Sequence, residues 1–262
     1  MQERHKDRKL YFNEQSATTE KYVIPYIQEI RKFDASSFIL EVGCGEGGNL
    51  EPFLKMGCKV YGIDILDHQI QIAREIFAHH PMHHNLNLIA QDIYKIKPED
   101  LPSFDVIFLR DVIEHIPDQQ KFMHFIKSFL KDDGVIFFGF PPWRMPFGGH
   151  QQVCQHKLLS KLPYFHLLPQ FLYASVLKSF GESKALIDGL KEVKETGISI
   201  HEFFRYLRTS GFEIARENHY LINPNYEIKF NLAPRMLPSI FKIPWLCDFY
   251  TTAVYCVAKK KL

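Results

Sequence analysis

Short apolar runs alternate with amphipathic stretches along this chain. Five runs of five or six mainly apolar residues lie at 38–42, 59–63, 86–90, 104–109 and 135–140. Such runs are typical of strands buried on both faces of a parallel sheet, whereas the spacing in 118–130 predicts a covering helix. With two further runs at 211–222 and 251–258, the pattern predicts an α/β fold with a doubly wound sheet of seven strands. A helix is also expected at 14–33, after a frayed polar end at 1–13.

A glycine-rich turn follows the first apolar run. Gly43, Gly45 and Gly47 stand at alternate positions, and residues 49–56 can continue as a helix. Glycine is needed where the backbone takes a positive φ or where a ligand lies against the main chain, and a helix N-terminus adds unpaired N–H groups. The turn is therefore predicted to bind a ligand.

Two kinds of ligand are compatible with the turn itself. Gly43, Gly45 and Gly48 fit the dinucleotide pattern G-x-G-x-x-G, and Asp64 follows about twenty residues later, so a nicotinamide or flavin cofactor is one candidate. Glu41 is less expected, because a carboxylate inside an apolar strand costs free energy unless it meets a polar partner.

The segment Leu40-Glu41-Val42-Gly43-Cys44-Gly45-Glu46-Gly47 resembles the first motif of the class I S-adenosylmethionine-dependent methyltransferases, which reads apolar-apolar-acid-apolar-Gly-x-Gly-x-Gly. The resemblance implies a Rossmann-like fold whose last strand is antiparallel, and S-adenosylmethionine as cofactor. It also implies that this segment contacts the cofactor, through Glu41, Gly43, Cys44, Gly45 and Gly47.

Four acidic or apolar positions after the next strands extend this assignment. Asp64 ends the second strand, where a carboxylate can accept both hydroxyls of a ribose. Its alternative role is to cap the following helix, for which Asp67 is better placed. By resemblance, Ile65 lies against the adenine, Asp92 accepts from the adenine amino group, and Ile93 offers its backbone N–H.

The fourth strand leads into Arg110-Asp111-Val112-Ile113-Glu114-His115, which resembles the corresponding segment of the ubiquinone-biosynthesis O-methyltransferase group. This segment is expected to face the methyl donor, with Arg110 among the cofactor residues. If residues 111–116 form a helical turn, Asp111, Glu114 and His115 share one face. They could then provide a general base or hold a divalent ion. We expect His115 to act in catalysis and no metal to bind.

Two insertions, 141–198 and 223–250, interrupt the expected core. The first brings His150 to the edge where the transferred methyl should point, so His150 is the leading candidate for substrate contact or general base. Its apolar part, 158–180, could form a lid, a dimer surface or a membrane contact, of which the lid is favoured. Aromatic residues of the second insertion could line the acceptor site or pack on one another: Tyr226, Phe230, Trp245 and Tyr250.

Composition excludes several classes of partner. The 32 basic and 30 acidic residues give no nucleic-acid-binding face, and no run is long enough to span a bilayer. Five cysteines without a C-x-x-C pair predict reduced thiols and, with no visible signal peptide, a cytoplasmic protein. A homodimer is compatible with the sequence.

The expected protein is one methyltransferase domain spanning 1–262. Its core comprises 34–140, 199–222 and 251–259, and the two insertions form a lid over the substrate. The predicted function is transfer of a methyl group from S-adenosylmethionine to a small-molecule acceptor, most simply at an oxygen of an apolar or aromatic compound. The alternatives are an NAD-dependent oxidoreductase and a non-catalytic S-adenosylmethionine-binding module.

Overall fold

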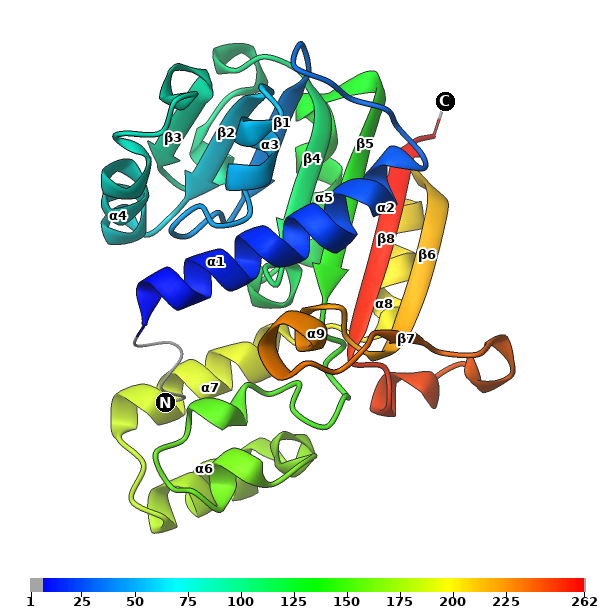
Figure 1. Ribbon diagram of the computed structural model, residues 1–262. Helices are drawn as coiled ribbons and strands as arrows, with labels where there is room; N and C mark the ends of the chain where they lie inside the picture. Colours follow the sequence, from blue (N-terminus) through cyan, green and yellow to red (C-terminus); the bar gives the residue numbers. More distant parts are fainter. Residues whose placement is uncertain (1–6, 262) are drawn as a thin grey trace.

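The computed structural model describes residues 7–261 and contains one mixed sheet of eight strands (Figure 1). The strand order is β3-β2-β1-β4-β5-β8-β6-β7. The strands are β1 Phe38–Val42, β2 Lys59–Asp64, β3 Leu86–Ala90, β4 Phe104–Arg110, β5 Leu130–Phe140, β6 Phe212–Ile222, β7 Arg235–Met236 and β8 Ala253–Lys260. The first five are parallel, and β8 runs antiparallel to β5 and β6, as predicted for the last strand.

The prediction of seven strands was wrong by one. The additional strand, β7, lies in the second insertion and pairs with the end of β6 through Tyr220 with Met236 and Ile222 with Arg235. A strand of two residues is too short to produce an alternating pattern in the sequence, so it could not be predicted.

The order of the strands places the site. The chain passes from β1 outward to β2 and β3, and then returns across β1 to β4 and β5. In such sheets ligands bind beyond the carboxyl ends of the strands, at the point where the order reverses. That point lies between β1 and β4, so the glycine turn after β1 and the segment after β4 meet there.

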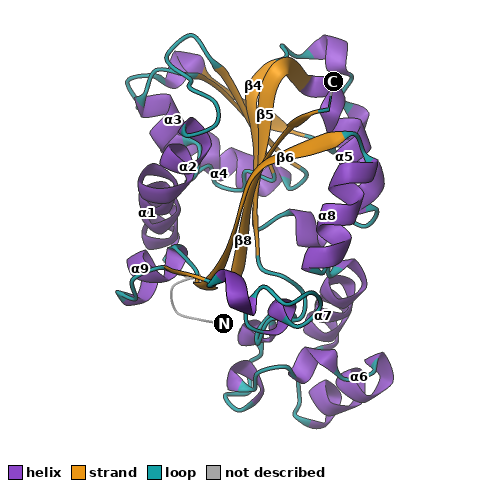
Figure 2. Cartoon of the chain, turned by 90° about the vertical axis from the view of Figure 1, so that its right-hand side faces the viewer, coloured by secondary structure: helices purple, strands orange, loops and turns teal. Residues whose placement is uncertain are grey.

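Helices cover both faces of the sheet (Figure 2). One face carries α1 Arg8–Thr18, the π-helical turn η2 Thr19–Val23, α2 Ile24–Gln28, α3 Glu51–Lys55 and α4 Asp67–Phe77, and the other carries α5 Gln119–Ile126 and α8 Ile200–Thr209. Alternate residues of β4 supply the two cores: Val106 and Phe108 pack toward the first face, Ile107 and Leu109 toward the second. Burial on both faces explains why this strand is almost wholly apolar.

The N-terminal helix begins earlier than predicted. The frayed end expected at 1–13 is wrong for residues 8–13, which belong to α1; residues 1–6 lie outside the described part of the chain. Asp7 caps this helix by accepting a hydrogen bond from the backbone N–H of Leu10 at 3.0 Å. Phe12 is buried against Phe77, with ring centroids 5.7 Å apart. That contact joins residues far apart in sequence, so local polarity concealed the helix.

The two insertions extend from the carboxyl edge of the sheet (Figure 1). The first contains α6 Gln170–Ser179 and α7 Lys184–Thr196 and has its own small core, which includes Phe165, Tyr173 and Leu177. The second contains α9 Asn225–Phe230 and β7. Tyr164 of the first donates its hydroxyl hydrogen to the carbonyl of Phe249 at 2.9 Å and so joins the two.

The remaining helical elements are single 3₁₀ turns: η3 His83–Asn85, η4 Ile93–Lys95, η5 Pro98–Asp100, η6 Ile113–His115, η7 Lys127–Phe129, η8 Gln151–Val153, η9 Leu159–Lys161, η10 Phe165–Leu167, η11 Ser239–Phe241 and η12 Cys247–Phe249. Within residues 7–261, none of the helices has the length and apolar character needed to cross a bilayer. All five cysteines are buried and unpaired.

Candidate functional site

The glycine turn is held by the carboxylate of Asp64. Gly43, Gly45 and Gly47 have φ values of +74°, +53° and +84°, which residues with a side chain rarely adopt. The N–H of Gly45 donates to Asp64 Oδ2 at 2.8 Å, and the N–H of Leu66 donates to Oδ1 at 2.9 Å. Asp64 therefore fixes both the turn and the loop after β2, and each oxygen keeps a lone pair for a ligand.

The expectation that Asp67 caps the following helix is wrong. Helix α4 begins at Asp67 itself, and its N-cap is Leu66, which makes no side-chain cap bond. An N-cap side chain accepts a hydrogen bond from a backbone N–H of the first turn, and Asp67 lies one position beyond the N-cap.

A buried polar network lies beneath the turn. Glu41 is fully buried and accepts a hydrogen bond from Asn49 Nδ2 at 2.8 Å. Arg110 Nη1 donates to Asn49 Oδ1 at 2.7 Å and to the carbonyl of Gln15 at 3.2 Å. Burial raises the pKa of Glu41 well above its usual range, against the opposing effects of Asn49 and Arg110. The second oxygen, Glu41 Oε2, has no hydrogen-bond partner among residues 7–261.

Two adjoining cavities flank the turn. The polar cavity has a volume of about 350 Å³, and the apolar cavity about 650 Å³. Gly43, Asp64 and Asp111 are among the residues that line both. The polar cavity is further lined by Cys44, Gly45, Glu46, Gln69, Arg110, Tyr11 and Gln15; the apolar cavity is further lined by Ile65, Asp92, Ile93, Tyr94, His115 and Phe122.

Most of the residues predicted to bind the cofactor therefore line one or both of these adjoining cavities. Glu41 and Gly47 line neither cavity, since they belong to the layer beneath the turn. At Gly47 a Cβ atom would lie only 2.7 Å from the ring of Phe77, so this glycine is required by packing. A Cβ at Gly45 would meet nothing closer than Gln69 Oε1 at 4.0 Å, so the space above this residue is open to a ligand.

A third cavity of about 290 Å³, which we call the insertion cavity, lies between the sheet edge and the two insertions. Met145, Phe147 and His150 come from the first insertion, and Asn225, Tyr226, Lys229 and Phe230 from the second. Asp111 lines all three cavities, and Tyr11 lines both the polar and the insertion cavity. These two residues therefore mark the junction between the cavities.

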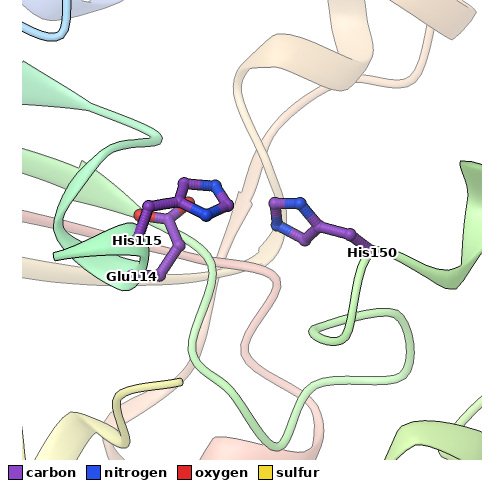
Figure 3. A group of neighbouring side chains, drawn as sticks. All are labelled: Glu114, His115 and His150. Atoms are coloured by element: carbon purple, nitrogen blue, oxygen red, sulfur yellow. The ribbon is translucent and has the colours of Figure 1, made fainter. Parts of the chain in front are cut away.

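Glu114, His115 and His150 form a titratable cluster at this junction (Figure 3). The ring centroids of the two histidines are 4.9 Å apart. Burial lowers the pKa of His150 to about 4 and also lowers that of His115, so both imidazoles are neutral near pH 7. Burial and then Asp111 raise the pKa of Glu114. Neither carboxylate oxygen of Glu114 has a hydrogen-bond partner in the described chain.

The cluster differs from the one expected on a single turn. Only residues 113–115 are helical, and Asp111 has a φ of +57°, which removes it from the shared face. His150, which also has a positive φ of +55°, takes its place from the first insertion. Such strained backbone is common at functional sites. The ligand atoms of the three residues lie within 4.8 Å of one another, so they could hold a metal ion.

Comparison with known proteins decides the family. Residues 16–162, more than half of the chain, match the model of a family described as a methyltransferase domain. The chain belongs to this family. The methyltransferase is 29% identical over 170 residues to a ubiquinone biosynthesis O-methyltransferase of Coxiella burnetii (strain Dugway 5J108-111), a match covering 62% of this chain and 67% of the relative. It is 34% identical over 112 residues to the ubiquinone biosynthesis O-methyltransferase of Pasteurella multocida (strain Pm70). This match covers 38% of this chain and 44% of the relative.

Solved structures show the same fold for the methyltransferase. A S-adenosylmethionine-dependent methyltransferase from Clostridium acetobutylicum ATCC 824 superposes with a TM-score of 0.57 at 12% identity, covering 94% of this chain and 92% of the other. The glycopeptide N-methyltransferase MtfA, complexed with sinefungin, gives 0.56 at 13% identity, covering 93% and 87%. The protein is thus a S-adenosylmethionine-dependent methyltransferase, and the comparisons give no support to a nicotinamide-dependent oxidoreductase.

Proposed function

We propose that this methyltransferase methylates an oxygen of a small apolar or aromatic acceptor bound in the insertion cavity. The observation that carries the proposal is the pair of neutral imidazoles, His115 and His150, where the insertion cavity meets the cofactor cavities. A neutral imidazole can remove the proton of a hydroxyl group. The ubiquinone biosynthesis O-methyltransferases among its relatives carry O-methylation in their name.

The proposed cofactor residues fit the chemistry of S-adenosylmethionine. The apolar cavity suits the adenosyl group: Asp64 would accept from the ribose hydroxyls, Asp92 from the adenine amino group, and Ile65 and Ile93 would contact the ring. The polar cavity suits the methionyl part, for which Gly43, Cys44, Gly45 and Arg110 supply backbone groups and a cation. Glu41 would act from beneath, through the Asn49 and Arg110 network.

The chemistry supplied by the bound cofactor is an electrophilic methyl group on a sulfonium sulfur. The chain must position the acceptor oxygen and remove its proton. His150 would accept the hydroxyl proton of the acceptor when the acceptor oxygen takes the methyl group. His115 and the uncharged form of Glu114 would hold the His150 ring in place. Tyr11, from α1, would close the junction from the other side.

The proposed acceptor class follows from the lining of the insertion cavity. Met145, Phe147, Tyr226 and Phe230 provide apolar and aromatic contacts, while Asn225 and Lys229 provide polar ones. A volume of about 290 Å³ is at the lower end of ordinary ligand pockets, which favours a small acceptor. We propose both insertions as the lid of this cavity, within one methyltransferase domain.

The proposal is tested by transfer of a labelled methyl group. The protein is incubated with methyl-labelled S-adenosylmethionine and a panel of phenols, aromatic acids and aliphatic alcohols, and products are identified by mass spectrometry. A methyl ether from a phenol supports the proposal. Label on nitrogen or carbon alone, with amines or carbon nucleophiles added as a second panel, would overturn the choice of oxygen.

A metal is the competing role for Glu114, His115 and His150, and we propose that none is needed. The carboxylate is the one acidic ligand in the set, and burial favours its uncharged form. Turnover should therefore survive dialysis against a chelator. A loss restored by Mg²⁺ or Zn²⁺, but not by Na⁺, would instead make this cluster a metal site.

A further inference from the structure

The tip of the second insertion exposes an unusual number of apolar side chains. Eight of the 21 exposed large hydrophobic residues in the described chain fall between positions 230 and 246. They are Phe230, Leu232, Met236, Ile240, Phe241, Ile243, Trp245 and Leu246, and we call them the tip surface. Ile240 is 79% exposed and Met236 62%. Contiguous exposed apolar residues mark interaction sites in soluble proteins. The segment projects beyond β6 in Figure 1, where it is orange.

This exposure is built into the folded segment. Leu237 and Cys247 are buried, at 5% exposure each, and anchor it to the main core. The hydroxyl of Tyr250 donates to the carbonyl of Phe241 at 2.5 Å. Trp245 stacks on His201 with ring centroids 4.6 Å apart. The segment is therefore held in place while its apolar side chains face outward.

The charged residues within the segment that carries the tip surface have one sign. No Asp or Glu occurs between Glu227 and Asp248, whereas Lys229, Arg235 and Lys242 lie within this stretch. The two bounding acids are occupied or hidden: Glu227 accepts a hydrogen bond from Lys21 at 2.7 Å, and Asp248 is 1% exposed.

An acid from outside the segment, Glu217 of β6, has its carboxylate 4.0 Å from Lys242 Nζ. That ion pair is half-exposed and therefore weak. Arg235 is exposed, so a net positive charge surrounds the apolar side chains.

We propose that the tip surface docks the protein on a bilayer containing anionic phospholipid. Aromatic and aliphatic side chains framed by bases are the combination that binds the interface of an anionic membrane. Tryptophan prefers the boundary between headgroups and acyl chains. A second copy of the chain is a poorer occupant, because an isologous contact would place Arg235 and Lys242 of both copies in one interface to which the segment contributes no acid.

The tip surface is continuous with the insertion cavity. Lys229 and Phe230 line that cavity, and Phe230 also belongs to the tip surface. A bilayer seated there would present a membrane-dissolved apolar acceptor to the mouth of the cavity. This consequence rests on the proposed function, whereas binding of the protein to vesicles does not.

The experiment is co-sedimentation with large unilamellar vesicles of phosphatidylcholine alone or with one third phosphatidylglycerol. The natural protein should bind the anionic vesicles and hardly the neutral ones, with binding weakened by added salt. Arg235→Gln should weaken binding about fivefold, the factor equivalent to about 1 kcal/mol per base at an anionic surface. Ile240→Asp should weaken it at least as much. Because Ile240 is largely exposed, its replacement leaves the core intact.

Ile76→Asp is the matched control, since Ile76 is a 42% exposed isoleucine on α4, away from the tip surface (Figure 1). It should bind as the natural protein does. The proposal is overturned if the natural protein does not bind anionic vesicles at low salt, or if Ile240→Asp binds equally well. It is also overturned if Phe171→Asp, on the exposed side of α6, removes binding while Ile240→Asp does not. Titration with S-adenosylhomocysteine separates this result from any failure of the methyltransferase proposal.

Discussion

At the scale of single residues, Asp64 has two tasks in one side chain. It holds the N–H groups of Gly45 and Leu66, and it is proposed to accept from the ribose. We expect Asp64→Ala to weaken binding of S-adenosylhomocysteine about 10- to 100-fold, because charge-assisted hydrogen bonds contribute about 1.5 to 3 kcal/mol each. Isothermal titration calorimetry measures this. His150→Ala is the control and should bind normally; equal losses in the two variants would show that the ribose site is misplaced.

The proposed role of His150 in removing a proton can be separated from cofactor binding. Replacement by Gln should lower kcat by about 10²- to 10⁴-fold, the usual contribution of a general base, and leave cofactor binding unchanged. The pKa of His150 is lowered to about 4 by burial and by His115 and His166, so the basic form persists at mildly acid pH. On the acid side, kcat/KM should fall as the pH drops through about 4, not through 6.5, because kcat/KM follows the groups of the free enzyme. A pH profile of kcat/KM that begins to fall near pH 6.5 would contradict the assignment of His150 as general base.

At the scale of elements, the first insertion can be loosened without touching the cofactor cavities. None of residues 141–198 lines the polar or the apolar cavity, whereas several line the insertion cavity. Leu177 is fully buried in the small core of this insertion, and Leu177→Ala should cost about 2 to 5 kcal/mol there.

We expect this variant to bind S-adenosylhomocysteine normally, to lose turnover and to be cut by protease within 141–198. Limited proteolysis and calorimetry on the same sample measure both effects. Leu172→Ala, at an exposed position of α6, should change neither. Parallel loss of cofactor binding and turnover in Leu177→Ala would show that the insertion supports the whole fold and is no separate lid.

The elements also show what sequence can and cannot predict. Strands β1 and β3 were predicted to the residue, since apolar runs between turns are a local property. The capping box of α8, in which Ser199 and Glu202 bond each other's backbone N–H, is a local feature of the same kind. The beginning of α1 was not, because it depends on the contact of Phe12 with Phe77.

The site followed the same division. Asp64 and Asp92 could be predicted to lie near the glycine turn, because the first directly follows a predicted strand and the second follows one after a single residue. The partnership of His115 with His150 could not, because it depends on how an insertion folds back over 35 positions of chain. Asp111, expected in that cluster, leaves it through a positive φ that the sequence did not indicate.

At the scale of the whole molecule, α1 connects the cofactor cavities to the second insertion. Tyr11 of α1 lines the polar and the insertion cavity, and in η2, which continues α1, Lys21 and the hydroxyl of Tyr22 both bind Glu227 of α9. The cofactor side of the site is therefore joined to the wall of the insertion cavity by one continuous helical run. Ordering of α1 by the cofactor should be transmitted to α9.

Hydrogen exchange measured by mass spectrometry tests this coupling. Saturating S-adenosylhomocysteine should slow amide exchange in α1 and in α9, while α6 and α7 remain unchanged, because they line neither cofactor cavity. In Lys21→Ala the slowing should persist in α1 and diminish in α9, since the ion pair with Glu227 is lost. Protection of α1 without α9 in the natural protein would show that the two cavities are independent. Protection spread evenly over α6 and α7 as well would mean that the cofactor tightens the entire fold, and that α1 has no special part in joining donor to acceptor.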